Sequence, residues 1–177
     1  MTDRNDAVPH NTEDRDWWYL HGEKEEKRFV ELCRVKFGLD AEINPEKDTN
    51  KYAPDLVVNG IVSDLKSQTT PFFTANRYKL DPRFTVTFNR KDYERYKTHY
   101  PNIDIYFWIN WSQTESKWGS VKYLAGIYMA PFTALEKMIE APAQEHHYLN
   151  RQDVGNRNAR SSFLLDVRHL TCLFFTE

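Results

Sequence analysis

The chain has 177 residues, of which 40% are hydrophobic and 28% charged, a composition typical of a globular protein with one core. Its net charge of −2 excludes a global positive field, so any binding of nucleic acid must depend on local basic patches. The sequence contains no apolar run of membrane-spanning length, no signal-peptide pattern and no metal-binding spacing of its two cysteines. We therefore expect a cytoplasmic protein without membrane contacts.

The N-terminal part of the sequence divides into a polar tail and a helix. Residues 1–16 are polar and acidic without a hydrophobic period, so we expect a flexible acidic tail before one domain over residues 17–177. Residues 16–37 place apolar side chains at helical spacing, and Gly38 follows as a suitable C-terminal cap. The sequence therefore predicts a helix that ends at Gly38.

One acidic residue of this helix, Glu26, lies among its apolar residues. At about 100° per residue, Glu26 falls on the same stripe as Val30, Cys33 and Phe37. A carboxylate directed toward a core is costly unless it is paired or bound to a metal, which makes Glu26 a candidate site residue. The alternative is that Glu26 lies in the first turn, at the frayed edge of the core, where acids favour the helix dipole.

A short strand and a hairpin follow this helix. Residues 39–44 favour a strand, and residues 45–53 are polar and predict a loop. Residues 54–68 contain two apolar runs on either side of Asn59-Gly60, which is the strongest short-range signal for a hairpin turn.

Beyond the hairpin, strands and helices alternate. The patterns predict a strand at 84–89, a helix at 89–101 with Asn89 as N-cap, strands at 103–111 and 120–130, a helix at 131–141, an irregular segment at 141–160, and one or two strands at 161–175. This order predicts a single mixed α/β domain in which helices flank a mixed sheet.

The hairpin carries three charged side chains, whereas strand interiors normally carry few. Side chains alternate between the faces of a strand, so Asp64 and Lys66 share one face and Leu65 points to the other. Asp55 begins the partner strand across the turn. Two carboxylates on paired strands can hold Mg²⁺, and the ammonium of Lys66 can act on an attacking water or on new negative charge. The alternative is a solvent-facing strand with a simple ion pair between Asp64 and Lys66.

These residues together resemble the pattern of a known nuclease superfamily. "GEKEE" in the first helix is followed by "PD", eight further residues and "DLK". This order resembles the PD-(D/E)XK superfamily, which includes many restriction endonucleases and archaeal Holliday-junction resolvases. The resemblance covers residues 22–68. The residues that match the superfamily's site positions are Glu26, Pro54, Asp55, Asp64, Lys66 and Gln68.

The resemblance implies a restriction-endonuclease-like core and hydrolysis of phosphodiester bonds with Mg²⁺ or Mn²⁺ as cofactor. It implies that Asp55 and Asp64 hold the metal together with the carbonyl oxygen of Leu65. Glu26 would complete the site directly or through water, or would help to bind a second metal. Lys66 would orient the nucleophilic water, whose pKa the metal lowers.

Basic residues that could contact a nucleic-acid backbone gather in two later segments. The stretch from residue 77 to 97 holds seven Arg or Lys residues against three acids, and another basic stretch lies near residue 157. The alternative is an ordinary solvated surface. The candidate contacts are Arg77, Lys79, Arg83, Arg90, Lys91, Arg95, Lys97, Arg157 and Arg160.

The sequence thus favours a metal-dependent nuclease with DNA as its expected partner, while RNA is not excluded and a homodimer is left open. The rival hypothesis is a catalytically silent protein of the same fold that serves as a nucleic-acid or protein-binding adaptor. A third hypothesis, a metal-free acid/base enzyme acting on a small molecule, lacks a second supporting motif.

Overall fold

The computed structural model describes residues 15–141, 145–147, 152–153, 157–158 and 161–176, with side chains described for 22–141, 145–147 and 161–176. The expected tail over residues 1–16 therefore lies almost entirely outside the described residues. The predicted first helix is confirmed as α1, Arg15–Phe37. It ends at Phe37, and Gly38 follows with a φ of 61°, in the left-handed region that glycine adopts without steric cost.

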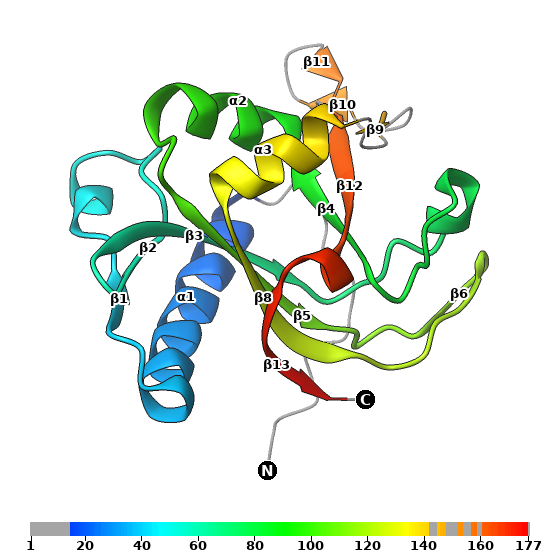
Figure 1. The fold of residues 1–177 in the computed structure, drawn as a ribbon, viewed down its shortest axis with the longest axis horizontal. Helices are drawn as coiled ribbons and strands as arrows, with labels where there is room; N and C mark the ends of the chain where they lie inside the picture. The colour runs from blue at the N-terminus through cyan, green and yellow to red at the C-terminus, as the bar shows by residue number, and fades with distance from the viewer. Residues whose placement is uncertain (1–14, 142–144, 148–151, 154–156, 159–160, 177) are drawn as a thin grey trace.

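A six-stranded mixed sheet forms the centre of the molecule (Figure 1). Its strands lie in the order β1-β2-β3-β5-β8-β13, and the pairing of β3 with β5 is parallel while the other pairs are antiparallel. The bounds are β1 Ala41–Ile43, β2 Leu56–Val58, β3 Ile61–Gln68, β5 Asp104–Asn110, β8 Ala125–Pro131 and β13 Thr171–Thr176. The expected mixed α/β architecture is confirmed.

The remaining elements include a second sheet of three strands in the order β4-β12-β9, comprising β4 Thr85–Asn89, β12 Ser162–Asp166 and β9 Glu145–His146. The other helices are α2 Arg90–His99, α3 Phe132–Glu140, η1 Pro45–Asp48, η2 Ala75–Tyr78 and η3 Val167–His169. Two small ribbons pair β6 Glu115–Ser116 with β7 Gly119–Ser120, and β10 Gln152–Asp153 with β11 Arg157–Asn158.

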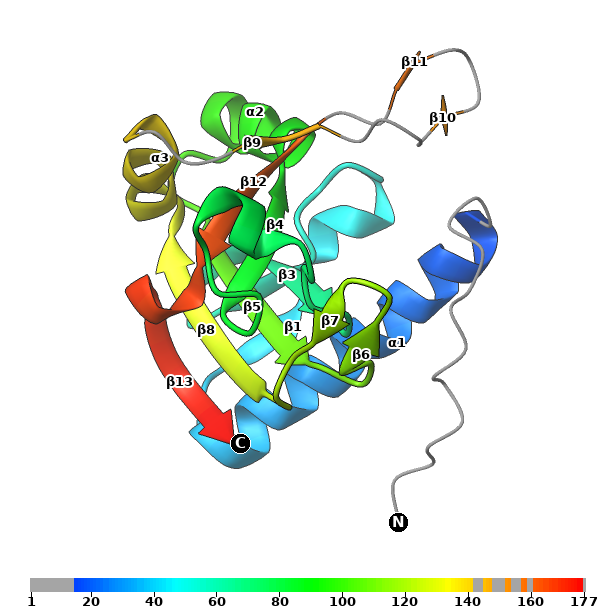
Figure 2. The ribbon, with the colours of Figure 1, turned by 90° about the vertical axis from the view of Figure 1, so that its right-hand side faces the viewer.

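The two faces of the central sheet are covered by different partners (Figures 1 and 2). Helix α1 packs Phe29, Val30 and Cys33 against Leu56 and Leu65 of the hairpin. On the opposite face, the second sheet and helices α2 and α3 enclose a larger apolar cluster. The hairpin therefore lies between two cores, and its side chains must divide between them.

The hairpin itself forms as predicted. Its turn has φ values of 50° at Asn59 and 77° at Gly60, which is the left-handed geometry that Asn-Gly favours. Leu56 pairs with Ser63, and Leu65 packs toward α1. Asp64 and Lys66 share one face of β3, as the sequence predicts, and the contact of Lys66 with Asp92 shows that α2 covers this face.

Some predicted boundaries are wrong. The strand expected over residues 120–130 begins at Ala125, because Gly119–Ser120 pairs instead with Glu115–Ser116 in a small ribbon. The loop at 45–53 contains the short helix η1, and the segment at 141–160 contributes strand β9 to the second sheet. Asn89 precedes α2, but its side chain accepts a hydrogen bond from Ser162 Oγ and makes no capping bond. In the described part of the chain, no helix is long and apolar enough to cross a membrane.

The packing of α1 on the sheet can be tested through Phe29. This side chain is fully buried, and its ring lies 5.6 Å from those of Tyr106 and Trp108. We expect Phe29→Ala to lower the free energy of unfolding by about 3–5 kcal/mol in chemical denaturation, because it leaves a cavity. Val35→Ala on the same helix is the matched control, since Val35 is 71% exposed and should cost less than about 0.5 kcal/mol. Equal losses in the two variants would contradict this docking.

Candidate active site

The candidate site lies where the pairing of β2 with β3 ends. The ladder stops at Leu56 and Ser63, and beyond it the Oδ2 atom of Asp55 accepts a hydrogen bond from the backbone N–H of Leu65 at 3.2 Å. The N–H and C=O groups of one strand residue point to the same edge, so the carbonyl of Leu65 also faces toward Asp55. The backbone before β2 is fixed by Asn44, whose N–H donates to the carbonyl of Asp55 at 2.9 Å.

The second carboxylate, that of Asp64, is almost completely buried. Asp64 is 2% exposed, and the Nζ atom of Lys66 lies 2.6 Å from its Oδ2 atom. The ammonium and Oδ2 form a close ion pair, and no other described residue donates a hydrogen bond to Oδ2. Lys66 also donates to Asp92 of α2 at 2.7 Å. The ammonium is therefore shared between the strand's own acid and an acid of the facing helix.

In this cluster, burial dominates only the protonation of Asp64. It raises the pKa of Asp64 to about 7, against the opposing attraction of Lys66, and the nearby charge of Asp55 adds to the increase. Burial also opposes the charge of Lys66, but the surrounding acids outweigh it and hold the pKa of Lys66 well above its usual value. The pKa of Asp92 is lowered, because Lys66 and Arg95 outweigh the effect of burial on this carboxyl.

Glu26 reaches the same region from α1. It lies well inside the helix and is 9% exposed, so the alternative of an exposed first-turn position is wrong. Its Oε2 atom accepts a hydrogen bond from Lys47 Nζ at 2.6 Å, and the same ammonium contacts Asp55 Oδ1 at 3.2 Å. Burial opposes the charge of Lys47, but both carboxylates outweigh it and raise the pKa of Lys47. Lys47 therefore joins α1 to the hairpin.

The predicted residues Glu26, Asp55, Asp64 and Lys66 thus come together in one connected group of charges. Glu26 and Asp55 meet through Lys47, and the charge of Asp55 acts on Asp64. The described residues contain no cluster of three or more His, Cys, Asp or Glu side chains in a metal-holding arrangement. The oxygen donors that remain for a cation are the two aspartates and the carbonyl of Leu65.

Gln68 is predicted as a site residue, but its amide is engaged elsewhere. Its Nε2 atom donates to the carbonyl of Thr87 at 2.9 Å, and its Oε1 atom accepts from the N–H of Thr87 at 3.2 Å. The side chain therefore pairs with β4 as a strand backbone would. This contact connects the central sheet to the second sheet beside the site.

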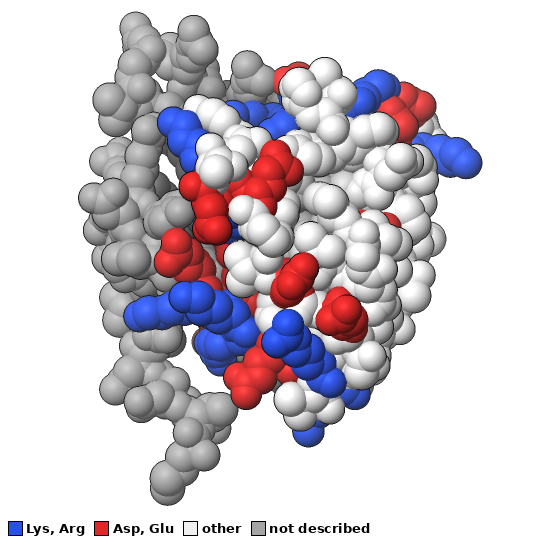
Figure 3. Space-filling model, turned by 90° about the vertical axis from the view of Figure 1, so that its left-hand side faces the viewer, with Lys and Arg blue, Asp and Glu red and all other residues white. Residues whose placement is uncertain are grey.

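Several of the basic residues predicted to contact phosphates are paired with acids. Arg90 binds both carboxylate oxygens of Glu145, and Lys97 contacts Glu136 at 2.8 Å and Glu140 at 3.0 Å. Figure 3 shows acidic and basic side chains interspersed on the face at the left-hand side of Figure 1, where β1 and α1 lie. The predicted basic residues therefore do not form one continuous positive field.

The other predicted basic residues are divided between distant elements. Arg77 stacks on Trp118 at 4.9 Å, and Arg83 donates to the carbonyl of Tyr123 at 3.2 Å. Lys79 and Lys91 are exposed. Of the two candidates in the C-terminal segment, Arg157 is described only as part of β11, and Arg160 lies outside the described residues.

Two residues of the site escape prediction from the sequence, namely Lys47 and Asp92. The dipeptide Asn44-Pro45 is a turn signal, and Asn44 does cap η1 by accepting a hydrogen bond from the N–H of Glu46. That signal predicts the turn but not the direction of Lys47. Asp92 lies in a helix rich in charges, and only the docking of α2 shows that it faces Lys66.

Comparisons of the chain with protein-family models, with curated proteins and with solved structures found no match.

The buried charge of Asp64 should make stability depend on pH. The folded state raises the pKa of Asp64 above its unfolded value, so the cost of its ionisation appears as the pH rises from about 4 through about 7. Asp64→Asn removes that cost. Relative to wild type in chelator, we expect the variant to gain about 1 kcal/mol or more in free energy of unfolding between pH 5 and pH 8, measured by urea denaturation.

The control for this experiment is the exposed Glu42, whose replacement by Gln should shift stability by less than about 0.5 kcal/mol at either pH. A stability difference between Asp64→Asn and wild type that stays constant with pH would show that Asp64 is not held in a buried, costly environment.

Proposed function

We propose that this protein is a metal-dependent nuclease that hydrolyses phosphodiester bonds, with DNA as its substrate. The observation that carries the proposal is the group of Asp55, Asp64 and Lys66 at the point where the β2–β3 ladder opens. The order of helix acid, Pro-Asp strand and Asp-x-Lys strand is the one that the PD-(D/E)XK resemblance implies. The parallel pairing of β3 with β5 after α2 is compatible with such a core.

The donor set suits a hard divalent cation. Mg²⁺ prefers oxygen ligands and is usually held by one or two carboxylates, with waters and substrate phosphate completing the shell. Asp55 and Asp64 supply two carboxylates, and the backbone of Leu65 supplies a carbonyl at the same edge. The buried Oδ2 atom of Asp64 already lies 2.6 Å from Lys66 Nζ, so a cation bound here would share that oxygen with the ammonium.

Lys66 is suited to act on the nucleophile. Its ammonium is fixed on both sides by Asp64 and Asp92, at 2.6 Å and 2.7 Å, so it is held in place before substrate arrives. In this position, it would orient a water and balance negative charge that develops on the phosphate. The chemistry supplied by a bound Mg²⁺ or Mn²⁺ would be neutralisation of the phosphate and a lower pKa of that water. Asp92 is then a positioning residue.

Lys47 supports the second candidate function, an adaptor without catalysis. Its ammonium already balances Glu26 and Asp55, so these acids do not require a metal for charge compensation.

A cleavage assay separates the two functions. A plasmid and a linear duplex are each incubated with the protein in Mg²⁺, Mn²⁺ or chelator. Cleavage that requires the metal supports the nuclease, whereas binding without cleavage under every condition supports the adaptor.

Variants of the hairpin charges test the nuclease directly. We expect Asp64→Asn and Lys66→Ala each to lower the cleavage rate by about 10²-fold or more, because each removes one preorganised charge. Asp64→Asn should also weaken Mn²⁺ binding, whereas Lys66→Ala should not. Rates are measured on linear DNA under single-turnover conditions, with Glu42→Gln as the control of unchanged rate.

Lys66→Ala also leaves two carboxylates without their shared partner, so its fold must be checked by circular dichroism. Lys66→Arg keeps the charge but alters its position, and we expect it to fold and still to lose cleavage. Wild-type rates in Asp64→Asn and in both Lys66 variants would refute the nuclease.

The ammonium of Lys47 should compete with a metal at the hairpin. Lys47→Met keeps the aliphatic stem and removes the charge that lies 3.2 Å from Asp55. We expect the variant to bind Mn²⁺ about fivefold more tightly or better, measured by calorimetry, because a nearby positive charge no longer repels the cation. Lys27→Met is the matched control, since Lys27 follows Glu26 on α1 but is exposed. Unchanged affinity in Lys47→Met would place the cation away from Asp55.

A further inference from the structure

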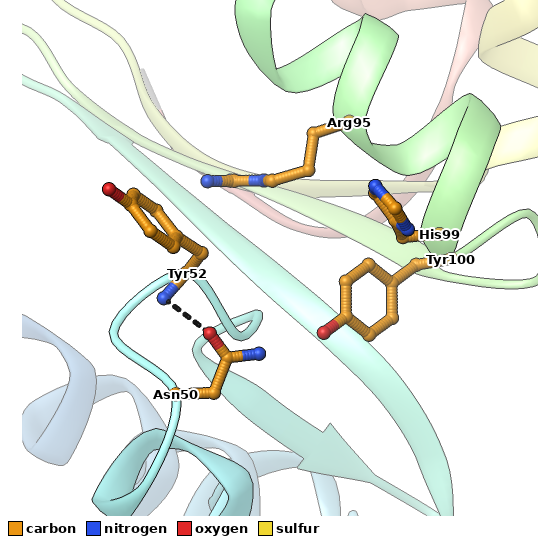
Figure 4. Close-up of a pocket in the computed structure, with 5 residues that line it drawn as sticks. All are labelled: Asn50, Tyr52, Arg95, His99 and Tyr100. Atoms are coloured by element: carbon orange, nitrogen blue, oxygen red, sulfur yellow. Dashed lines mark hydrogen bonds between the residues drawn. The ribbon is translucent and has the colours of Figure 1, made fainter.

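A cavity of about 390 Å³ lies next to the candidate site, between the loop after η1 and the C-terminal end of α2 (Figure 4). This size falls within the range of about 300–1,000 Å³ that is typical of small-molecule sites. The residues that line it combine two phenol rings, a guanidinium, an imidazole and an amide. They are Asn50, Tyr52, Arg95, His99 and Tyr100.

The walls of this cavity are held in place by one carboxylate. Glu46 Oε1 accepts hydrogen bonds from Asn50 Nδ2 at 2.8 Å and from the hydroxyl of Tyr100 at 2.9 Å. Asn50 Oδ1 in turn accepts from the backbone N–H of Tyr52 at 3.0 Å. The contacts join the loop after η1 to the end of α2, so the cavity is largely formed before any ligand binds.

Two side chains of the cavity remain available to a ligand. Tyr52 is 55% exposed, and Figure 4 shows its ring lying across the cavity from the guanidinium of Arg95. The hydrogen bonds of Arg95 to Asp92 and to the Tyr96 hydroxyl use only the Nη2 atom, and the Nε atom is buried, so Nη1 is the donor that remains for a ligand. The Nζ atom of Lys51, 5.0 Å from the Tyr52 ring centroid, adds positive charge at the rim.

The chemistry of the cavity matches a nucleotide better than a simpler ligand. A free anion would not need the aromatic rings, and an apolar ligand would leave Arg95 and His99 unused. A nucleotide offers a flat base for stacking on an aromatic ring and a phosphate for a guanidinium, which is how single strands are commonly bound.

The cavity is also connected to the candidate active site through α2. Arg95 Nη2 lies 3.0 Å from Asp92 Oδ1, and the other oxygen of Asp92 lies 2.7 Å from Lys66 Nζ. We infer that the cavity binds one nucleotide of the substrate strand next to the scissile phosphate, with its base stacked on Tyr52 and its phosphate at Arg95. This inference rests on the proposed nuclease function, because it takes the substrate to be a nucleic acid.

The test measures the contribution of the bases to binding, in chelator, where no cleavage occurs. The two probes are a fluorescently labelled oligothymidylate and the same backbone without bases, each titrated with the full-length protein and followed by anisotropy. We expect wild type to bind the base-bearing probe at least about fivefold more tightly than the abasic probe. Tyr52→Ala should lose this preference without weakening the binding of the abasic probe.

Matched variants make the result specific. Tyr52→Phe should keep the preference because it keeps the ring, and Tyr123→Ala should also keep it, since Tyr123 is 45% exposed but lies outside the cavity. Arg95→Gln should weaken the binding of both probes by the same factor, because both probes carry the phosphates that Arg95 is inferred to contact. A wild-type preference in Tyr52→Ala, or an undiminished affinity of Arg95→Gln for the abasic probe, would overturn the inference.

The outcome is separable from that of the proposed function. A preference for the base-bearing probe that disappears in Tyr52→Ala supports nucleotide binding in the cavity, whether or not a metal induces cleavage. If no metal induces cleavage, the protein is a nucleic-acid adaptor. Metal-dependent cleavage with base preference unchanged in Tyr52→Ala leaves the nuclease intact and refutes the nucleotide cavity.

Discussion

The burial of the Asp64 carboxylate is the constraint on which the candidate site depends. Asp64 lies within the central strand β3 and is almost inaccessible to water, so its charge must be balanced by protein groups or by a bound cation. Lys66 provides that balance and is itself held by Asp92 from α2. Buried ion pairs of this kind rarely add net stability, because desolvation offsets their attraction. A role in the proposed chemistry would account for a buried pair that adds little to folding.

Two lysines divide the compensation of charge between them, and each joins a pair of acids from different elements. Lys47 of η1 bridges Glu26 of α1 and Asp55 at the start of the hairpin. Lys66 bridges Asp64 of its own strand and Asp92 of α2. The acids can therefore stay close together in the absence of a cation. A nuclease would use this arrangement as a resting state that a metal and a phosphate reorganise, whereas an adaptor would retain it unchanged.

Helix α2 connects the proposed chemistry to the proposed binding of a nucleotide. Asp92, Arg95 and His99 are three and four residues apart, so they share one face of the helix. Asp92 faces Lys66, and the next two residues of this series line the cavity. Lys97 points instead toward Glu136 and Glu140 of α3. The basic residues that appear as one group in the sequence thus serve different faces, and ion pairs already neutralise several of them.

The local patterns of the sequence determined much of the fold. The apolar stripe of α1, the Asn59-Gly60 turn and the alternation along β3 depend on neighbours within a few residues, so they can be read directly from the sequence. The same alternation placed Asp64 and Lys66 on one face. It did not show that the face is buried.

Only the tertiary structure decided which distant groups meet these charges. Lys47 and Asp92 reach the site because η1 and α2 both dock against the hairpin, and no local period encodes that docking. The role of Gln68 was likewise decided by the neighbouring Thr87, which pairs with its amide. Hydrogen bonds and ion pairs act over a few ångströms in space, whereas sequence patterns report only neighbours along the chain. The sequence therefore supplied the charges of the site, and the packing of separate elements decided how each charge is balanced.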